Sequence, residues 1–217
     1  MAMIEKTLTV ETVLRALITT PSDYNREEER LPMIVFLHGA GERGDDLSRL
    51  RVNGIAKYFG EDPHFRNLRV ITVSPQCPAN CVWPQLSLQL VKFISQLVEE
   101  FNVDPDRVSI TGLSMGGFGT WEMLNTCPNF FSAAAPICGG GMSWRIPENM
   151  KTPVRAFHGY DDDVVPYSLS VDMVEGVNRR GGRATLTTYH GCGHNSWDPA
   201  YETTDVIEWL ATSVRKK

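Results

Sequence analysis

Short runs of apolar residues recur along the chain between polar and glycine-rich stretches. The run at 32–39 is apolar at successive positions, which is typical of a strand covered on both faces of a sheet. Residues 8–19 instead place β-branched side chains at spacing two, which predicts one or two early strands. Further apolar runs predict strands within 69–75, 104–112, 131–140, 153–160 and 184–191.

Between these runs, apolar residues recur at helical spacing. The segment 85–101 carries an apolar stripe made of Leu86, Leu90, Phe93, Leu97 and Phe101. Helices are also predicted within 115–127, 164–180 and 198–216. In the last of these, Asp198 is the expected cap, and a proline follows at the next position.

The predicted elements alternate, strand then helix, along most of the chain. This order predicts an α/β fold, with a mostly parallel sheet and helices on both faces, in a single domain over residues 1–217. In such sheets, ligands bind outside the carboxyl ends of the strands. Residues that carry chemistry are therefore expected directly after the apolar runs.

Composition and charge narrow the range of partners. The net charge is −5, and there is no basic patch of the kind that binds phosphate backbones, so nucleic acid is not an expected partner. No apolar run reaches the roughly 18 residues that cross a bilayer, so no membrane span is predicted. The N-terminal stretch lacks the features of a signal peptide, which predicts a cytoplasmic protein; a secreted origin with the signal removed stays open.

The chain contains five cysteines, an odd number. None of them belongs to a CxxC pair or to a His/Cys cluster with zinc spacing, so no metal or other cofactor is expected. Free, mostly buried thiols are predicted. A local bridge between Cys77 and Cys81, which lie close together in a loop, is the open alternative.

The segment "GLSMGG" fits the pattern G-x-S-x-G, with Ser114 at its centre. It follows a predicted strand and precedes a predicted helix, which is the context of a nucleophile elbow. The turn is so tight that side chains two residues before and after the serine would collide, which explains Gly112 and Gly116. A glycine-rich turn without chemistry and a phosphate-binding loop are the alternatives.

A serine nucleophile needs a base and an acid that orients the base. Among the histidines, His194 is the best placed base, because it lies in a glycine-rich loop between the last strand and the last helix. His38 and His158 each end a strand and are expected to hydrogen-bond neighbouring loops, and His64 is expected at the surface. The acid should be one of three consecutive aspartates after the strand at 153–160.

Four motifs in this order, "HGAGERG", "GLSMGG", "HGYDDDVVP" and "GCGHNSW", resemble the serine-hydrolase branch of the α/β-hydrolase fold. The likeness covers about residues 30–212 and is closest to small carboxylesterases. These are related to dienelactone hydrolases, feruloyl esterases, polyhydroxybutyrate depolymerases and predicted peptidases of the phospholipase/carboxylesterase type. The resemblance implies Asp162, three places after the glycine of its motif, as the acid, and His194 as the base. Dienelactone hydrolases use a cysteine nucleophile, and this chain departs from them with its serine.

Acyl transfer also needs two N–H donors for the oxyanion. The elbow supplies the N–H of Met115, and the resemblance implies that of Ala40, with Gly41 as the alternative. Gln76 and Trp83 are candidate substrate-binding residues, because they follow a strand end near the same mouth. Trp197 is another, because it lies three residues after His194. Glu42 and Arg43 are expected either to form a rim salt bridge or to contact a polar substrate.

Only about 15 residues separate the predicted strands at 131–140 and 153–160, too few for a cap domain, so an open site is expected. These features predict a serine esterase that hydrolyses short-chain or aryl carboxylic esters through Ser114, His194 and Asp162. The partner is then a small-molecule ester. A serine peptidase or amidase on the same triad is the first alternative, and a non-catalytic binding protein on a hydrolase scaffold is the second.

Overall fold

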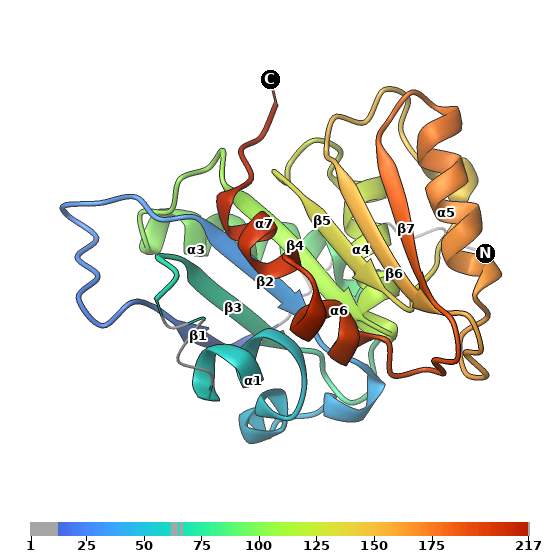
Figure 1. Cartoon of the computed structure of the whole chain (residues 1–217). Coiled ribbons are helices and arrows are strands. Elements are labelled where there is room, and N and C mark those ends of the chain that lie inside the picture. Colours follow the sequence, from blue (N-terminus) through green and yellow to red (C-terminus); the bar gives the residue numbers. More distant parts are fainter. Residues whose placement is uncertain (1–12, 62–64, 66, 217) are drawn as a thin grey trace, which may run out of the picture.

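The computed structural model describes residues 13–61, 65 and 67–216 of the chain. Seven strands in this part form one sheet in the order β1-β3-β2-β4-β5-β6-β7 (Figure 1). Strand β1 pairs antiparallel with β3, and all other neighbours pair in parallel. The strands are β1 Arg15–Thr19, β2 Met33–Leu37, β3 Ile71–Gln76, β4 Val108–Leu113, β5 Ala134–Ile137, β6 Val154–Gly159 and β7 Ala184–Tyr189.

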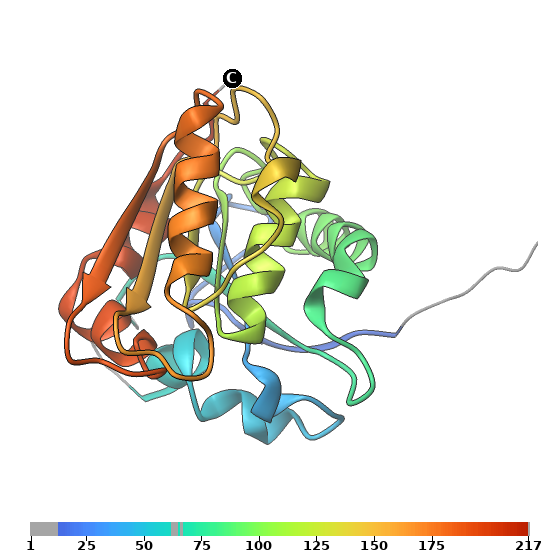
Figure 2. The same ribbon diagram turned by 90° about the vertical axis from the view of Figure 1, so that its right-hand side faces the viewer.

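Two layers of helices enclose this sheet (Figure 2). The first layer consists of α3 Ser87–Glu100, α4 Met115–Thr126 and α5 Ser168–Arg179. The second consists of α1 Gly54–Glu61, α6 Trp197–Thr203 and α7 Val206–Thr212. Four short 3-10 helices complete the described elements: η1 Ala40–Glu42, η2 Leu47–Arg51, η3 Trp83–Leu86 and η4 Ser143–Arg145.

Strand β2 shows how the sequence builds both layers of the core. Its five residues are all buried, and they alternate between the two hydrophobic clusters. Met33, Val35 and Leu37 pack with α3 and α4, whereas Ile34 and Phe36 pack with α1 and α7. An uninterrupted apolar run is what a central strand with two covered faces requires, so the predicted fold class is confirmed.

The structure also confirms that no cap domain is inserted between β5 and β6. The connection from Ile137 to Val154 contains only the short helix η4. The carboxyl ends of β4, β6 and β7 therefore open directly onto a shared edge of the sheet. None of the helices in the described part of the chain is both long and apolar enough to span a membrane.

Some predictions about individual elements need correction, one is confirmed, and others fall outside the described residues. The closing helix is two helices, α6 and α7, and Ser196 rather than Asp198 occupies the N-cap position of the first. Helix α1 has no counterpart among the predicted elements. The predicted free thiols are confirmed: Cys77 and Cys81 are not bridged, and all five cysteines are free, although only Cys77 and Cys138 are buried. Residues 8–12 of the first predicted strand, and His64, lie outside the described residues.

Candidate active site

Ser114 lies on the turn between β4 and α4. Its backbone angles, φ 53° and ψ −118°, are unfavourable for a residue with a side chain. The neighbouring chain leaves no room for other residues around the turn: a methyl group on Gly116 would lie 1.8 Å from Leu37 O, and one on Gly112 would lie 2.4 Å from Gly116 O. The close approach of α4 to the end of β2 thus explains both glycines of the motif.

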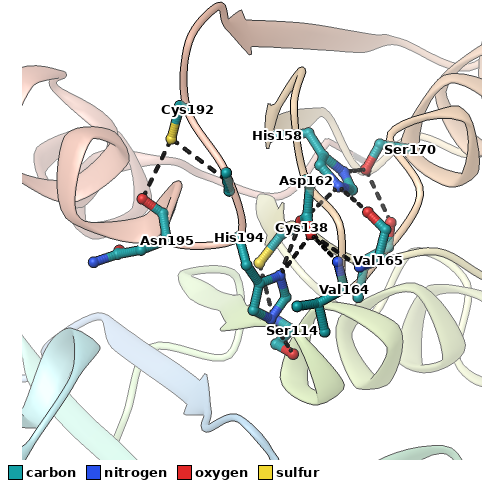
Figure 3. A network of polar contacts seen from close by, with 12 residues as sticks. Ser114, Cys138, His158, Asp162, Val164, Val165, Ser170, Cys192, His194 and Asn195 are labelled. Carbon is teal, nitrogen blue, oxygen red and sulfur yellow. Dashed lines mark hydrogen bonds and ion pairs between the residues drawn. The ribbon is translucent and has the colours of Figure 1, made fainter.

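The structure brings Ser114, His194 and Asp162 together from three separate loops (Figure 3). His194 Nε2 lies 3.0 Å from Ser114 Oγ, and His194 Nδ1 lies 2.9 Å from Asp162 Oδ2. Because a carboxylate only accepts hydrogen bonds, Nδ1 carries the ring proton in neutral His194, which leaves Nε2 free to accept the serine proton. This is the arrangement that a serine nucleophile needs.

Asp162 is the only one of the three consecutive aspartates that faces His194. Its side chain is fully buried, and its Oδ1 accepts the N–H groups of Val164 and Val165, each at 2.9 Å. Burial by itself raises the pKa of Asp162, but the hydrogen bonds from His194 and from these two N–H groups outweigh it and hold the pKa below its usual value. The acid therefore remains ionised while it orients the imidazole.

His158, at the end of β6, supports Asp162 from the side away from the serine (Figure 3). Its ring is fully buried, with Nε2 3.2 Å from Asp162 Oδ2 and 3.0 Å from Val165 O. Both of these neighbours are acceptors, so Nε2 carries the proton. Its Nδ1 lies 2.7 Å from Ser170 Oγ on α5. Burial lowers the pKa of His158 and keeps the ring neutral. The predicted loop-bracing role of this histidine matches these contacts.

His38 holds the loop that follows β2. The Cys77 N–H donates to His38 Nε2 at 2.9 Å, so the ring proton is on Nδ1, which donates to Gly39 O at 2.5 Å. The Gly39 carbonyl thus faces His38, and because a trans peptide opposes its C=O and N–H groups, the Ala40 N–H points away from the ring. Burial lowers the pKa of His38, which favours the neutral ring that this contact needs.

Ala40 and Met115, the two candidate oxyanion donors, occupy equivalent positions in their elements. Each is the first residue of a helix, η1 for Ala40 and α4 for Met115. The N–H group at that position has no carbonyl partner within its own helix. A methyl group on Gly39 would lie 3.8 Å from Ser114 Cβ, so the loop before Ala40 runs directly beside the serine.

A cleft of about 520 Å³ opens at the serine. Its lining includes Ser114, His194, Ala40 and Trp197, and Trp197 also packs edge-on against the His194 ring at 5.4 Å between centroids. Of the three predicted substrate-binding residues, Trp197 therefore does line the cleft. The remaining lining residues are Gly39, Gly41, Glu42, Arg49, Val52, Asn53, Leu113 and Val164.

Gln76 and Trp83 are placed differently from the prediction. Trp83 is completely buried, and its indole N–H donates to His38 O at 2.9 Å. Gln76 is 3 % exposed, and its Nε2 donates to Glu42 O and Asp46 O, each at 2.9 Å. Both residues follow strand ends near the mouth, as predicted, but their polar groups turn inward and brace the loop that carries Ala40.

A salt bridge between Glu42 and Arg43, one of the two alternatives for this pair, is absent from the described residues. The Arg43 guanidinium donates instead to Ala40 O and to Cys81 O. The carboxylate of Glu42 accepts a hydrogen bond from Asn53 Nδ2 at 2.7 Å. The sequence reasoning missed three cleft residues, Arg49, Val52 and Asn53, which lie within or just after η2 in a segment without any recognisable motif.

The chain is similar in sequence to a known protein family and to individual esterases. The sequence profile of the phospholipase/carboxylesterase family matches residues 70–214. A bifunctional acetylxylan esterase/xylanase from Neocallimastix patriciarum is 33 % identical over 118 residues, which are 46 % of this chain and 18 % of that protein. A probable feruloyl esterase C from Aspergillus niger is 24 % identical over 182 residues, 82 % of this chain and 66 % of that protein.

Among solved structures, a thermostable esterase superposes with a TM-score of 0.81 and 35 % identity, over 93 % of this chain and 60 % of the other. This chain therefore spans less than a fifth of the acetylxylan esterase/xylanase and three fifths of the thermostable esterase. The sheet order, the strained serine turn and these matches define the class, a protein with the α/β-hydrolase fold. Within that class, the chain belongs to the phospholipase/carboxylesterase family.

Proposed function

We propose that the protein hydrolyses short-chain or aryl carboxylic esters through a Ser114–His194–Asp162 triad and an acyl-enzyme. The observation that carries this proposal is the continuous hydrogen-bonded chain from Ser114 Oγ through both nitrogens of His194 to Asp162. The names of the relatives support the substrate range, since acetyl groups are short acyl chains and feruloyl groups are aromatic.

In the first half of the reaction, Ser114 Oγ attacks the ester carbonyl carbon while its proton passes to His194 Nε2. The N–H groups of Ala40 and Met115 stabilise the negative charge that develops on the carbonyl oxygen. The carbon–oxygen bond to the alcohol then breaks, and His194 gives its proton to the departing alcohol. Asp162 remains ionised throughout and stabilises the charged form of His194.

In the second half, water replaces the alcohol. His194 Nε2 takes a proton from the water as its oxygen attacks the acyl carbon, and the same proton returns to Ser114 Oγ as the acid leaves. Among the described residues, no cap is inserted between β5 and β6, so bulky soluble esters have access to the serine. The mechanism consumes one water and requires no cofactor.

Labelling with a fluorophosphonate tests the proposal. We expect the intact mass of the wild-type protein to rise by a single adduct, and the Ser114→Ala variant to remain unlabelled. An unlabelled but folded wild-type protein would contradict the proposed triad and favour a non-catalytic binding protein. Turnover of an ester compared with its matched amide then separates an esterase from a peptidase or amidase.

A further inference from the structure

The cleft has one wall made of polar side chains. This wall is formed by Glu42 of η1, Arg49 of η2, and Asn53, which lies between η2 and α1. Glu42 is only 7 % exposed, although it lies at the rim of a cleft that is open to solvent. The other walls are largely apolar and are formed by Val52, Leu113, Val164 and Trp197.

The contacts of the Glu42 carboxylate leave an acceptor unused. Its Oε1 accepts from Asn53 Nδ2, so the amide nitrogen must face the carboxylate, and Asn53 Oδ1 is left as a second free acceptor. His38 Nδ1 lies 4.0 Å from Glu42 Oε2, too far for a hydrogen bond, and its N–H is engaged by Gly39 O. Among the described residues, no group donates a hydrogen bond to Oε2 or to Asn53 Oδ1.

The free carboxylate oxygen lies close to the nucleophile. A methyl group built on Gly39 would lie 3.3 Å from Glu42 Oε2 and 3.8 Å from Ser114 Cβ. Glu42 Oε2 and Ser114 Cβ therefore lie close enough together for one ester substrate to reach both residues. Because Glu42 lines the cleft and its Oε2 has no donor among the described residues, a hydroxyl group that enters the cleft can donate to this oxygen.

We propose that Glu42 Oε2 and Asn53 Oδ1 form a subsite that binds hydroxyl groups of the substrate. This proposal rests on the proposed ester hydrolysis and specifies its substrate class as neutral, hydroxylated esters. Charge supports neutrality: the carboxylate of Glu42 disfavours an anionic substrate, and the guanidinium of Arg49 in the same cleft disfavours a cationic one. Hydroxyl groups donate to a carboxylate without bringing charge of their own.

Two pairs of matched esters test the subsite. The first pair is 2,3-dihydroxypropyl butyrate and propyl butyrate, which differ only in hydroxyls on the alcohol. The second is ethyl 3-hydroxybutyrate and ethyl butyrate, which differ in a hydroxyl on the acyl chain. We expect wild-type kcat/KM to favour the hydroxylated member of at least one pair by about tenfold, the effect of a hydrogen bond to a charged group. Equal kcat/KM values within both pairs would overturn the inference.

The variants Glu42→Gln and Asn53→Ala assign the preference to this wall. If the side-chain oxygen of the Glu42→Gln variant keeps the contact with Asn53, an amide N–H₂ replaces the free acceptor. We therefore expect the kcat/KM ratio of the hydroxylated to the plain ester to fall about tenfold. Asp45→Asn is the matched control, since it removes an exposed carboxylate of the same loop that does not line the cleft. Its ratio should equal that of the wild type.

The ratio separates the possible failures. A loss that is equal for both members of a pair would mean that Glu42 and Asn53 only brace the loop, and would overturn the subsite while leaving ester hydrolysis intact. Failure of the wild type to turn over any of the four esters, together with no fluorophosphonate adduct, would overturn the proposed function and the subsite with it. A preference that survives in both variants would also overturn the subsite.

Discussion

Three consecutive aspartates, Asp161, Asp162 and Asp163, are chemically identical but lie in different surroundings. The Asp162 side chain is buried and holds His194. Asp161 Oδ2 instead accepts the N–H of Gly191, and Asp163 is exposed. Because the three side chains are identical, their position in the loop alone decides which carboxylate contacts His194. The resemblance selected Asp162, whereas the residues alone left all three open.

We expect Asp162→Asn to lower kcat by several orders of magnitude, on the order of 10⁴ as in the best-studied triad, because the amide favours the wrong tautomer of His194. Esterase assays should find Asp163→Asn close to the wild type, since its carboxylate is exposed to solvent and does not face His194. The two variants carry the same change in charge. Retained activity in Asp162→Asn, with loss in Asp163→Asn or Asp161→Asn, would refute the assignment of the acid.

His158 provides a second imidazole N–H to the same carboxylate. We expect His158→Leu to lower kcat about tenfold, by removing a hydrogen bond to a charged group. Ser170→Ala is the control, because Ser170 contacts His158 but not Asp162. A wild-type kcat in His158→Leu would mean that the ring only fills space.

At the scale of elements, helix α4 must approach β2 closely enough to present Ser114. We expect Gly116→Ala to destabilise the protein by about 1–3 kcal/mol or to prevent folding, because the added methyl would lie 1.8 Å from Leu37 O. Gly41→Ala is the matched control, since nothing lies within 4 Å of its added methyl. Urea unfolding of both variants measures the difference. Equal midpoints would show that α4 is not held against β2.

The strands and the serine turn were predictable because their signals are local. A buried strand needs a run of apolar residues, and a turn this tight needs glycine. The break between α6 and α7 was not predictable from apolar spacing alone. If α6 and α7 formed one continuous helix, Thr204 and Asp205 would lie on the same buried face as Ala200 and Tyr201, four positions earlier. The chain instead leaves the helix at Thr204, whose Oγ1 donates to Ala200 O.

For the residues around the cleft, too, the sequence predicted what depends on local signals and missed what depends on contacts with distant loops. The position of Gln76 and Trp83 at a strand end correctly predicted that they lie near the cleft. It did not predict the orientation of their side chains. That orientation depends on carbonyl groups of distant loops, His38 O for Trp83 and Glu42 O for Gln76. Asn53 was missed because its contact with Glu42 joins two loops that share no motif.

At the scale of the whole molecule, two buried neutral histidines hold the two sides of the site. His38 fixes the loop after β2, and His158 fixes the loop after β6. Glu42 and Arg43 face His38, while Asp162 and His194 face His158. Burial is nevertheless the largest influence on each ring, and it lowers both pKa values below 6.5. The same desolvation that keeps the rings neutral links the stability of the fold to pH.

Because both folded-state pKa values are lowered, the unfolded chain binds protons first as the pH falls below 6.5. Stability should therefore be fully present above pH 6.5 and fall below it, by up to about 1.4 kcal/mol per pH unit for each histidine. Asp162, whose pKa is also lowered, adds a further loss only below its usual value of 3.8. We expect urea midpoints to decrease between pH 7.5 and 5.5, and the slope to be shallower in His158→Gln. A midpoint independent of pH over this range would mean that the buried rings accept protons without cost, in conflict with their desolvation.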